Sequence, residues 1–169
     1  MAIISGITKS IYTGNGTATD PYIISTATQF VAMQNAIRDG NAFRGKYFLQ
    51  TADLNLNYCA DYQPMLEGTF SGTYNGNGYV IKVKTDPVST ASYAPPFFWY
   101  VDGVIVNTGF DVDIRGSVET SYGICRKFTS GGKMLNCYIV GKIIGNRLLL
   151  DPVDSIFSID TLLYSNLIC

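Results

Sequence analysis

Apolar and polar residues alternate along much of this chain, in short runs that are separated by turn-forming residues. A period of two residues is typical of strands that bury one face. The densest turn signal lies in residues 71–81, where the pairs Asn75-Gly76 and Asn77-Gly78 tolerate the positive φ of tight turns. This stretch leads directly into the alternating segment 80–84, which predicts a turn followed by a strand.

One segment breaks this period and predicts a helix over residues 27–39. Thr26 can be its N-cap, and Gln29 stands three residues later, as in a capping box. Gly40 is placed to end the helix in the left-handed conformation. The apolar positions follow helical spacing: Phe30, Val31, Met33, Ala36 and Ile37. We expect this apolar face to cover the open end of a β-structure.

The second half of the chain contains a repeat. Residues 103–116 align with residues 132–145 without a gap. The matched pairs are Val106 with Leu135, Asn107 with Asn136, Phe110 with Ile139 and Ile114 with Ile143. Apolar residues at one constant offset predict stacked, equivalent strands, and the matched asparagines predict an asparagine ladder at a corner. The repeat therefore favours a β-solenoid.

These patterns predict a mainly β protein of one domain in three parts. Residues 1–45 hold an N-terminal strand, expected at residues 1–11, and the capping helix. Residues 46–145 form the rungs of the solenoid. Residues 146–169 are strongly apolar and interrupted by Asp151-Pro152. We expect this tail to cap the last rung or to dock onto another subunit, because an open strand edge pairs with other chains.

Several blocks of the chain resemble the GLUG-motif β-solenoid proteins of bacterial and phage surfaces. The blocks are residues 16–30, which include Asp20-Pro21-Tyr22, then 43–56, 70–81, 122–125 and 131–138. The resemblance covers roughly residues 14–145. The chain departs from the pattern at Phe97-Phe98-Trp99, where a turn of the Leu-Phe-Gly type is usual. The resemblance implies a short right-handed β-solenoid with one N-terminal capping α-helix, used for display, adhesion or assembly.

Composition narrows the classes of partner and of chemistry. The 12 basic and 13 acidic residues give a net charge of −1, so no strong field would attract nucleic acid or an acidic membrane. No apolar stretch is long enough to span a bilayer, and residues 1–6 do not have the pattern of a secretory signal. The chain has no histidine, which excludes Ser-His and Cys-His nucleophiles and the commonest metal ligand.

The four cysteines are Cys59, Cys125, Cys137 and Cys169. Because none forms a CxxC pair, a zinc site or a redox motif is not expected. We expect free thiols, most of them buried as small apolar groups.

Two polar rows suggest candidate sites. Asp111, Asp113 and Arg115 alternate on one strand and share a face, as catalytic carboxylates do in β-solenoid polysaccharide lyases and hydrolases. The alternative, which we favour, is a solvated face with a local ion pair, because the aligned repeat continues no acidic groove. Asp53, Asn55 and Asn57 could be calcium ligands, but one carboxylate among amides is a poor calcium site, so we favour a solvent-facing strand edge.

One further stretch suggests a ligand site, and a second is excluded as one. The aromatic residues Phe97, Phe98, Trp99 and Tyr100 could stack on a sugar or form a protein interface. We expect two of the four to be buried, because alternation buries every other residue. The glycine-rich stretch 71–78 is not a phosphate loop, since it lacks the Gly-Lys-Ser/Thr ending and leads into a strand.

The sequence therefore predicts a non-enzymatic structural or interaction protein without a cofactor, a metal site or catalytic residues. A virion surface component is the favoured class, such as a capsid decoration, head fibre or tail-associated protein, made in the host cytoplasm without a signal peptide. The tail 146–169 would join other subunits, for example in a homotrimer. A bacterial surface adhesin or carbohydrate-binding module, with a glycan as ligand, is the alternative, and a polysaccharide-degrading enzyme is the third hypothesis.

Overall fold

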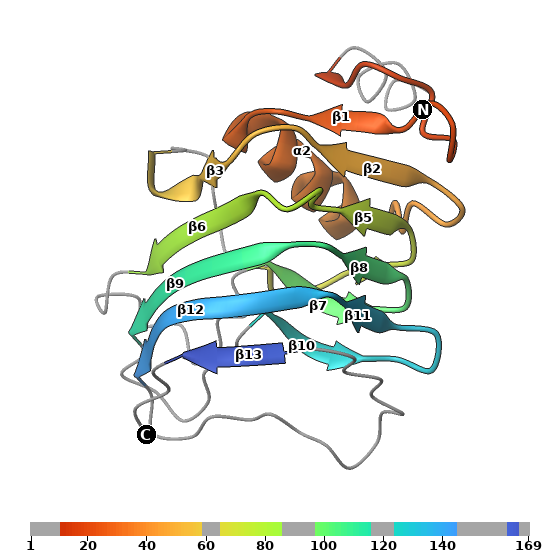
Figure 1. Ribbon diagram of the computed structural model, residues 1–169. Helices are drawn as coiled ribbons and strands as arrows, with labels where there is room; N and C mark the ends of the chain where they lie inside the picture. The colour runs from red at the N-terminus through yellow and green to blue at the C-terminus, as the bar shows by residue number, and fades with distance from the viewer. Residues whose placement is uncertain (1–10, 59–64, 86–96, 116–123, 145–161, 166–169) are drawn as a thin grey trace.

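The computed structural model describes residues 11–58, 65–85, 97–115, 124–144 and 162–165 (Figure 1). The described chain is mainly β, with three parallel sheets and one α-helix. The expectation of a mainly β protein with an N-terminal helix is thereby confirmed, and parallel strands in this arrangement fit a β-helix-like fold.

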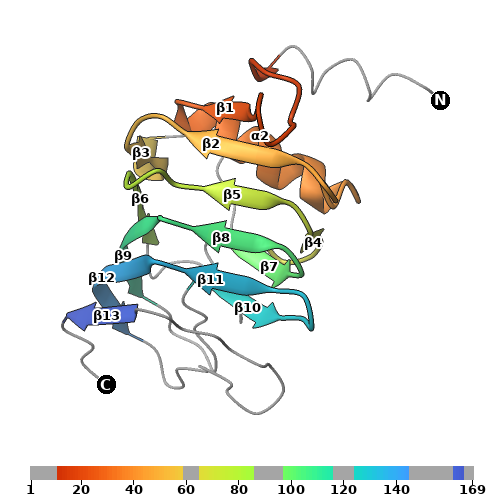
Figure 2. The ribbon, with the colours of Figure 1, turned by 45° about the vertical axis from the view of Figure 1, so that its right-hand side comes forward.

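Three sheets hold the described strands. Sheet A, which faces the viewer in Figure 2, contains β1 (Tyr22–Ile24), β2 (Tyr47–Gln50), β5 (Thr73–Asn75), β8 (Val104–Val106) and β11 (Lys133–Leu135). Sheet B contains β3 (Leu54–Asn55), β6 (Val80–Thr85), β9 (Gly109–Arg115), β12 (Cys137–Ile144) and β13 (Leu162–Ser165). Sheet C contains β4 (Thr69–Phe70), β7 (Phe98–Val101) and β10 (Cys125–Phe128).

Successive strands of the chain belong to the three sheets in a fixed order. From β2 to β12 it passes through sheet A, then B, then C, and begins again, with the short 3-10 helix η1 (Leu56–Tyr58) after β3. We call one such passage a circuit. Each strand pairs in parallel with the equivalent strand of the next circuit. Strands far apart in sequence therefore lie side by side.

The predicted repeat is confirmed by the register of its two circuits. Val106 pairs with Leu135, Phe110 with Ile139 and Ile114 with Ile143, as the gap-free alignment requires. The asparagine ladder is also present, since the side-chain amide of Asn136 donates to Asn107 across 2.7 Å. Asn107 donates in turn to Asn75 across 3.2 Å, which extends the ladder to a third circuit.

The core consists of columns of apolar side chains that follow the strand register. In sheet A the buried column is Phe48, Tyr74, Ile105 and Met134. In sheet B it is Leu54, Ile81 and Phe110, and in sheet C it is Phe70 and Val101. The strands in these columns thus place one face inside, where the stacked rings and branched chains exclude water.

The helix α2 (Ala27–Arg38) has the ends that the sequence predicts. Thr26 and Gln29 form a capping box. Gly40 has a φ of 94°, and the amides of Gly40 and Asn41 donate to Ile37 and Ala36, as in a Schellman motif.

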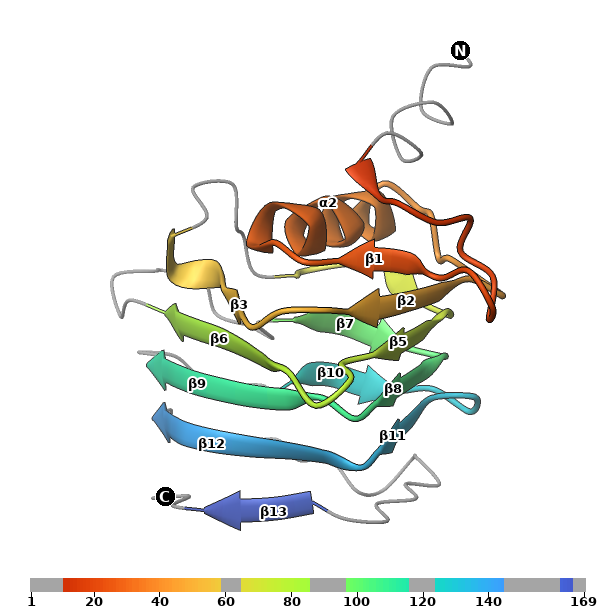
Figure 3. The same cartoon turned by 45° about the horizontal axis from the view of Figure 1, so that its top comes forward.

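The apolar face of α2 covers the N-terminal end of the stack (Figure 3). The ring of Phe30 contacts those of Tyr74, Phe97 and Phe98. Gln34 donates from Nε2 to the carbonyl oxygen of Phe97 across 2.9 Å. The helix therefore takes the capping position that was expected of it.

Glycine at position 103 marks the corner between sheets C and A, where successive circuits approach closely. A Cβ atom at Gly103 would lie 2.0 Å from the carbonyl oxygen of Gly72 in the preceding circuit. The amide of Val104 donates to that same oxygen across 2.9 Å. No side chain fits there, so glycine permits the hydrogen bond that closes the corner.

Parts of the predicted organisation lie outside the described residues. These parts are the strand expected at residues 1–11, except for residue 11, and most of the tail 146–169. Within the tail the structure describes β13, whose residues Leu162–Ser165 pair in parallel with Cys137–Val140 of β12. This segment extends sheet B by one strand.

Candidate functional site

The acidic row on β9 forms ion pairs between circuits. Asp111 Oδ2 lies 2.8 Å from Nζ of Lys82 on β6, and the two residues are register partners. The next outward pair along these strands is Lys84 with Asp113. The favoured hypothesis of a solvated face with an ion pair fits this arrangement. The partner of Asp111, however, is Lys82 on the neighbouring strand β6 and not a residue nearby in the sequence. The side chain of Arg115 lies outside the described residues.

The row Asp53, Asn55 and Asn57 points outward, as predicted, while Leu54 and Leu56 are buried. Each polar side chain accepts a backbone N–H. Asp53 accepts from Val80, Asn55 from Asn57, and Asn57 from Lys84. These oxygens therefore hold the neighbouring circuit and the local turn, and the described residues contain no group of three or more potential metal ligands of the His, Cys, Asp or Glu type.

The prediction that two of the four aromatic residues are buried is confirmed, but its reason is wrong. The buried residues are the adjacent Phe97 and Phe98, not alternate ones. Phe97 lies just before β7, at the bend that enters sheet C, so the alternation of the strand does not extend to it. Its ring contacts Phe30 and Phe110, whereas Phe98 contacts Phe30 and Phe70.

The remaining two aromatic residues are half-buried on sheet C and contact an arginine. The guanidinium carbon of Arg126 lies 4.5 Å from the ring centroid of Trp99 and 5.7 Å from that of Tyr100. Its Nη1 donates to the Tyr100 hydroxyl across 3.3 Å. We call Trp99, Tyr100 and Arg126 the aromatic–arginine cluster. It combines ring faces with a cation on an outer surface, and it is the strongest candidate for a binding site.

Sequence reasoning missed Arg126 because the repeat changes register in sheet C. Carried back from Gly103 and Gly132, the gap-free alignment would place Trp99 beside Phe128. The structure pairs Phe98 with Cys125 instead, which brings Arg126 beside Trp99. The cause is the connection to sheet A, which is Asp102-Gly103 in one circuit and the longer turn 129–132 in the next.

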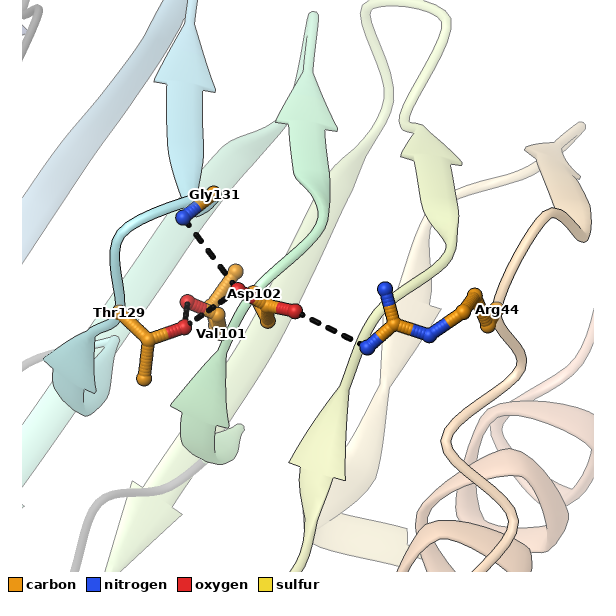
Figure 4. A network of polar contacts seen from close by, with 5 residues as sticks. All are labelled: Arg44, Val101, Asp102, Thr129 and Gly131. Atoms are coloured by element: carbon orange, nitrogen blue, oxygen red, sulfur yellow. Dashed lines mark hydrogen bonds and ion pairs between the residues drawn. The ribbon is translucent and has the colours of Figure 1, made fainter.

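That longer turn carries the polar network in Figure 4. Asp102 Oδ1 accepts from the Thr129 hydroxyl across 2.7 Å and from the Gly131 amide across 3.3 Å, and Oδ2 lies 3.2 Å from Nη2 of Arg44. The Thr129 hydrogen bond, assisted by Gly131 and Arg44, lowers the pKa of Asp102. The carboxylate links three segments at one corner, so its role is structural.

The thiols of Cys125 and Cys137 are free, as predicted. Burial raises the pKa of both thiols above the usual range, which makes them poor nucleophiles at neutral pH. Cys59 and Cys169 lie outside the described residues.

The stretch 71–78 forms β5 and a turn in which Asn77 and Gly78 have positive φ, and the amides of Gly76 and Gly78 donate to the next circuit. Its backbone therefore closes a corner.

Fold and site together define a class: a parallel-stranded β protein whose outer faces carry charge pairs and one aromatic–arginine cluster. No family model matches the chain, and no curated protein matches it. Among solved structures, it is similar to the crystal structure of a candidate immunoglobulin A1 protease from Bacteroides ovatus. The two are 27% identical with a TM-score of 0.51, over 78% of this chain and 41% of that chain. The chain thus matches less than half of that protein's length.

No helix among the described residues is long and apolar enough to cross a membrane.

Proposed function

We propose that this chain is a short right-handed β-solenoid that acts by assembly and display, without chemistry of its own. The observation that carries this proposal is the continuous parallel register between circuits, from β2 to β12. Outward polar groups such as Asp53, Asn57 and Asp111 are engaged with the neighbouring circuit. A surface whose polar groups bond to the neighbouring circuit suits a rigid scaffold better than a catalytic cleft.

The place of action that we propose is the surface of a virion, with the bacterial cell surface as the alternative. The resemblance to GLUG-motif proteins supports either location. The likeness to a Bacteroides ovatus protein is a specific observation in favour of the bacterial alternative. Within the apolar tail 146–169, β13 extends sheet B of the same chain. In both cases we propose that the rest of the tail joins the chain to other subunits.

The oligomeric state of the full chain tests this proposal. Light scattering coupled to size-exclusion chromatography should show an oligomer, such as a trimer. Leu149→Asp, in the apolar run 148–150, should shift the protein towards monomer, because a carboxylate in an apolar interface is costly. Lys133→Asp, at an exposed position of β11, is the control and should not. A wild-type protein that stays monomeric at high concentration and binds no particle would refute assembly as the function.

Proteolysis is the second candidate, because the similar structure is described as a candidate immunoglobulin A1 protease. Incubation with immunoglobulin A1 and with casein, followed by electrophoresis, tests it. Cleavage that is lost in the double variant Asp111→Asn, Asp113→Asn would assign an activity to this chain and overturn the non-enzymatic proposal. Intact substrates after prolonged incubation would remove the second candidate.

A further inference from the structure

We propose that the aromatic–arginine cluster binds a carboxylate-bearing sugar, with the carboxylate on Arg126 and the sugar ring against the aromatic rings. This inference rests on the proposed function, since it gives the displayed surface of the scaffold a ligand class. It is carried by the contacts of Arg126, by the charge around it and by its place on an outer sheet.

Arg126 is held in place before any ligand arrives. Its guanidinium lies over the ring of Trp99 at 4.5 Å and close to Tyr100, whose hydroxyl accepts a hydrogen bond from Nη1. The two rings are 6.0 Å apart and tilted by 59°, so they form a corner around the cation. An arginine fixed by stacking loses less side-chain freedom on binding than a mobile one.

Arg126 also retains capacity for an anion. A guanidinium has five N–H donors in a planar fork that matches a carboxylate bidentately. The Tyr100 hydroxyl accepts one of these donors, and no carboxylate among the described residues pairs with Arg126. By contrast, Arg44 on the neighbouring corner is paired with Asp102.

The surrounding charge favours a small anionic group rather than a polyanion. Lys127 follows Arg126 on β10, both residues are exposed, and Lys127 is the register partner of Tyr100. A site built on the single guanidinium of Arg126 suits a ligand with one or a few carboxylates. Nucleic acid would need a longer basic surface, and the whole chain has a net charge of −1.

The aromatic rings favour a ring-shaped partner. Trp99 and Tyr100 are half-buried on an outer sheet, so part of each side chain is exposed, and both rings contact the guanidinium of Arg126. A pyranose presents an apolar C–H face to such rings while its carboxylate reaches the arginine. Because the guanidinium already lies over Trp99, the sugar ring would contact the exposed parts of the two aromatic side chains. Its carboxylate would bind Arg126, which is a contact that a neutral sugar lacks.

Isothermal titration calorimetry on the full chain tests the inference, with trigalacturonate and sialyllactose as probes of the two common sources of sugar carboxylate. We expect at least one of them to bind, and its neutral counterpart, the trigalacturonate methyl ester or lactose, to bind at least about tenfold more weakly. The inference is overturned when neither acidic sugar binds at about 10 mM, or when the neutral counterpart binds equally well.

Arg126→Lys separates the bidentate contact from simple charge. Lysine keeps the positive charge but not the planar fork, so we expect affinity for the acidic sugar to fall about tenfold or more. Lys133→Ala removes a positive charge at an exposed position of β11 and should leave the affinity unchanged. Circular dichroism melting checks that both variants are folded. Equal affinity of Arg126→Lys and wild type would overturn the proposed contact.

The outcomes distinguish this inference from the proposed function. A protein that forms the expected oligomer but binds neither acidic sugar overturns the ligand class and leaves the assembly proposal intact. A monomer that binds an acidic sugar through Arg126 overturns assembly and leaves the ligand class supported.

Discussion

Asn107 and Asn136 occupy the same corner of successive circuits and share both a backbone conformation and a hydrogen bond. Their φ angles are 53° and 49°, and the side-chain amide of Asn136 donates to Oδ1 of Asn107 across 2.7 Å. Asparagine is among the few residues that tolerate this left-handed region. One residue type therefore satisfies the corner's backbone geometry and links the circuits through its amide.

Asn107→Ala should destabilise the protein by about 2–3 kcal/mol. Alanine loses the side-chain bonds to Asn75 and Asn136 and adds a strained left-handed residue. Asn107→Gly removes the same bonds without the strain and should cost about 1 kcal/mol less. Urea unfolding measures both. If the two variants were as stable as wild type, the ladder would have no energetic role.

The asparagine ladder shows how far the sequence predicts this fold. A gap-free alignment of two segments was enough for the register of sheets A and B, because side chains stacked in columns must repeat at one offset. The third member, Asn75, was missed since the turn after β5 is longer than its counterpart after β8. The asparagines of a corner fall at one constant offset in the sequence only where the turns of neighbouring circuits have equal lengths.

The candidate site was predictable only in part, for a related reason. The four aromatic residues are recognisable in the sequence as a cluster. The pairing of Trp99 with Arg126, however, depends on two additional residues in the turn 129–132. The sequence alone does not reveal such a change of strand register. Likewise Asp111 was expected to have a local partner, whereas register places Lys82, 29 residues earlier, beside it. Contacts between circuits follow from register, not from neighbours along the chain.

Gly103→Ala should destabilise the protein by about 1–3 kcal/mol, because its Cβ would lie 2.0 Å from the carbonyl oxygen of Gly72. Gly103→Asn should be at least as harmful, since the limit is space. At Gly78 the limit is instead its φ of 84°, with no atom within 4 Å of an added Cβ. There Asn should recover most of the stability that Ala loses. Thermal melting of the four variants measures this, and rescue of position 103 by Asn would contradict the close approach.

Tyr74→Phe should destabilise the protein by about 1–3 kcal/mol at neutral pH. The Tyr74 hydroxyl donates to Oε1 of Gln50 across 2.8 Å, and both side chains are buried. Phenylalanine preserves the ring in its column but leaves that oxygen without its partner. Gln50→Leu in the Tyr74→Phe background removes the unpaired oxygen and should recover part of the loss. An unchanged urea midpoint for Tyr74→Phe would show that the hydrogen bond contributes nothing net.

The same pair predicts a loss of stability at alkaline pH. Burial raises the pKa of Tyr74 well above its ordinary value of 10.0, so the folded protein keeps the proton that the unfolded chain releases. The contribution is complete below about pH 10 and is lost as pH rises above it, by about 1.4 kcal/mol per pH unit. The stability gap between wild type and Tyr74→Phe should therefore narrow above pH 10, which guanidinium unfolding at pH 8 and pH 11 measures. A constant gap would contradict the prediction.

Asp102→Asn should cost about 1 kcal/mol at pH 7, because the amide keeps an acceptor for Thr129 but loses the ion pair with Arg44. The hydrogen bond from Thr129 lowers the pKa of Asp102 below its ordinary value of 3.8. The stabilisation is therefore complete above about pH 4 and is lost as pH falls through the folded-state pKa. The free energies of unfolding of wild type and Asp102→Asn should therefore become equal in acid. Arg44→Ala should return the pKa of Asp102 only part of the way to its ordinary value, since Arg44 is a minor cause of the shift. Urea unfolding between pH 2 and pH 7 and NMR titration of the carboxyl carbon measure both effects, and a variant as stable as wild type at pH 7 would show that this corner does not depend on charge.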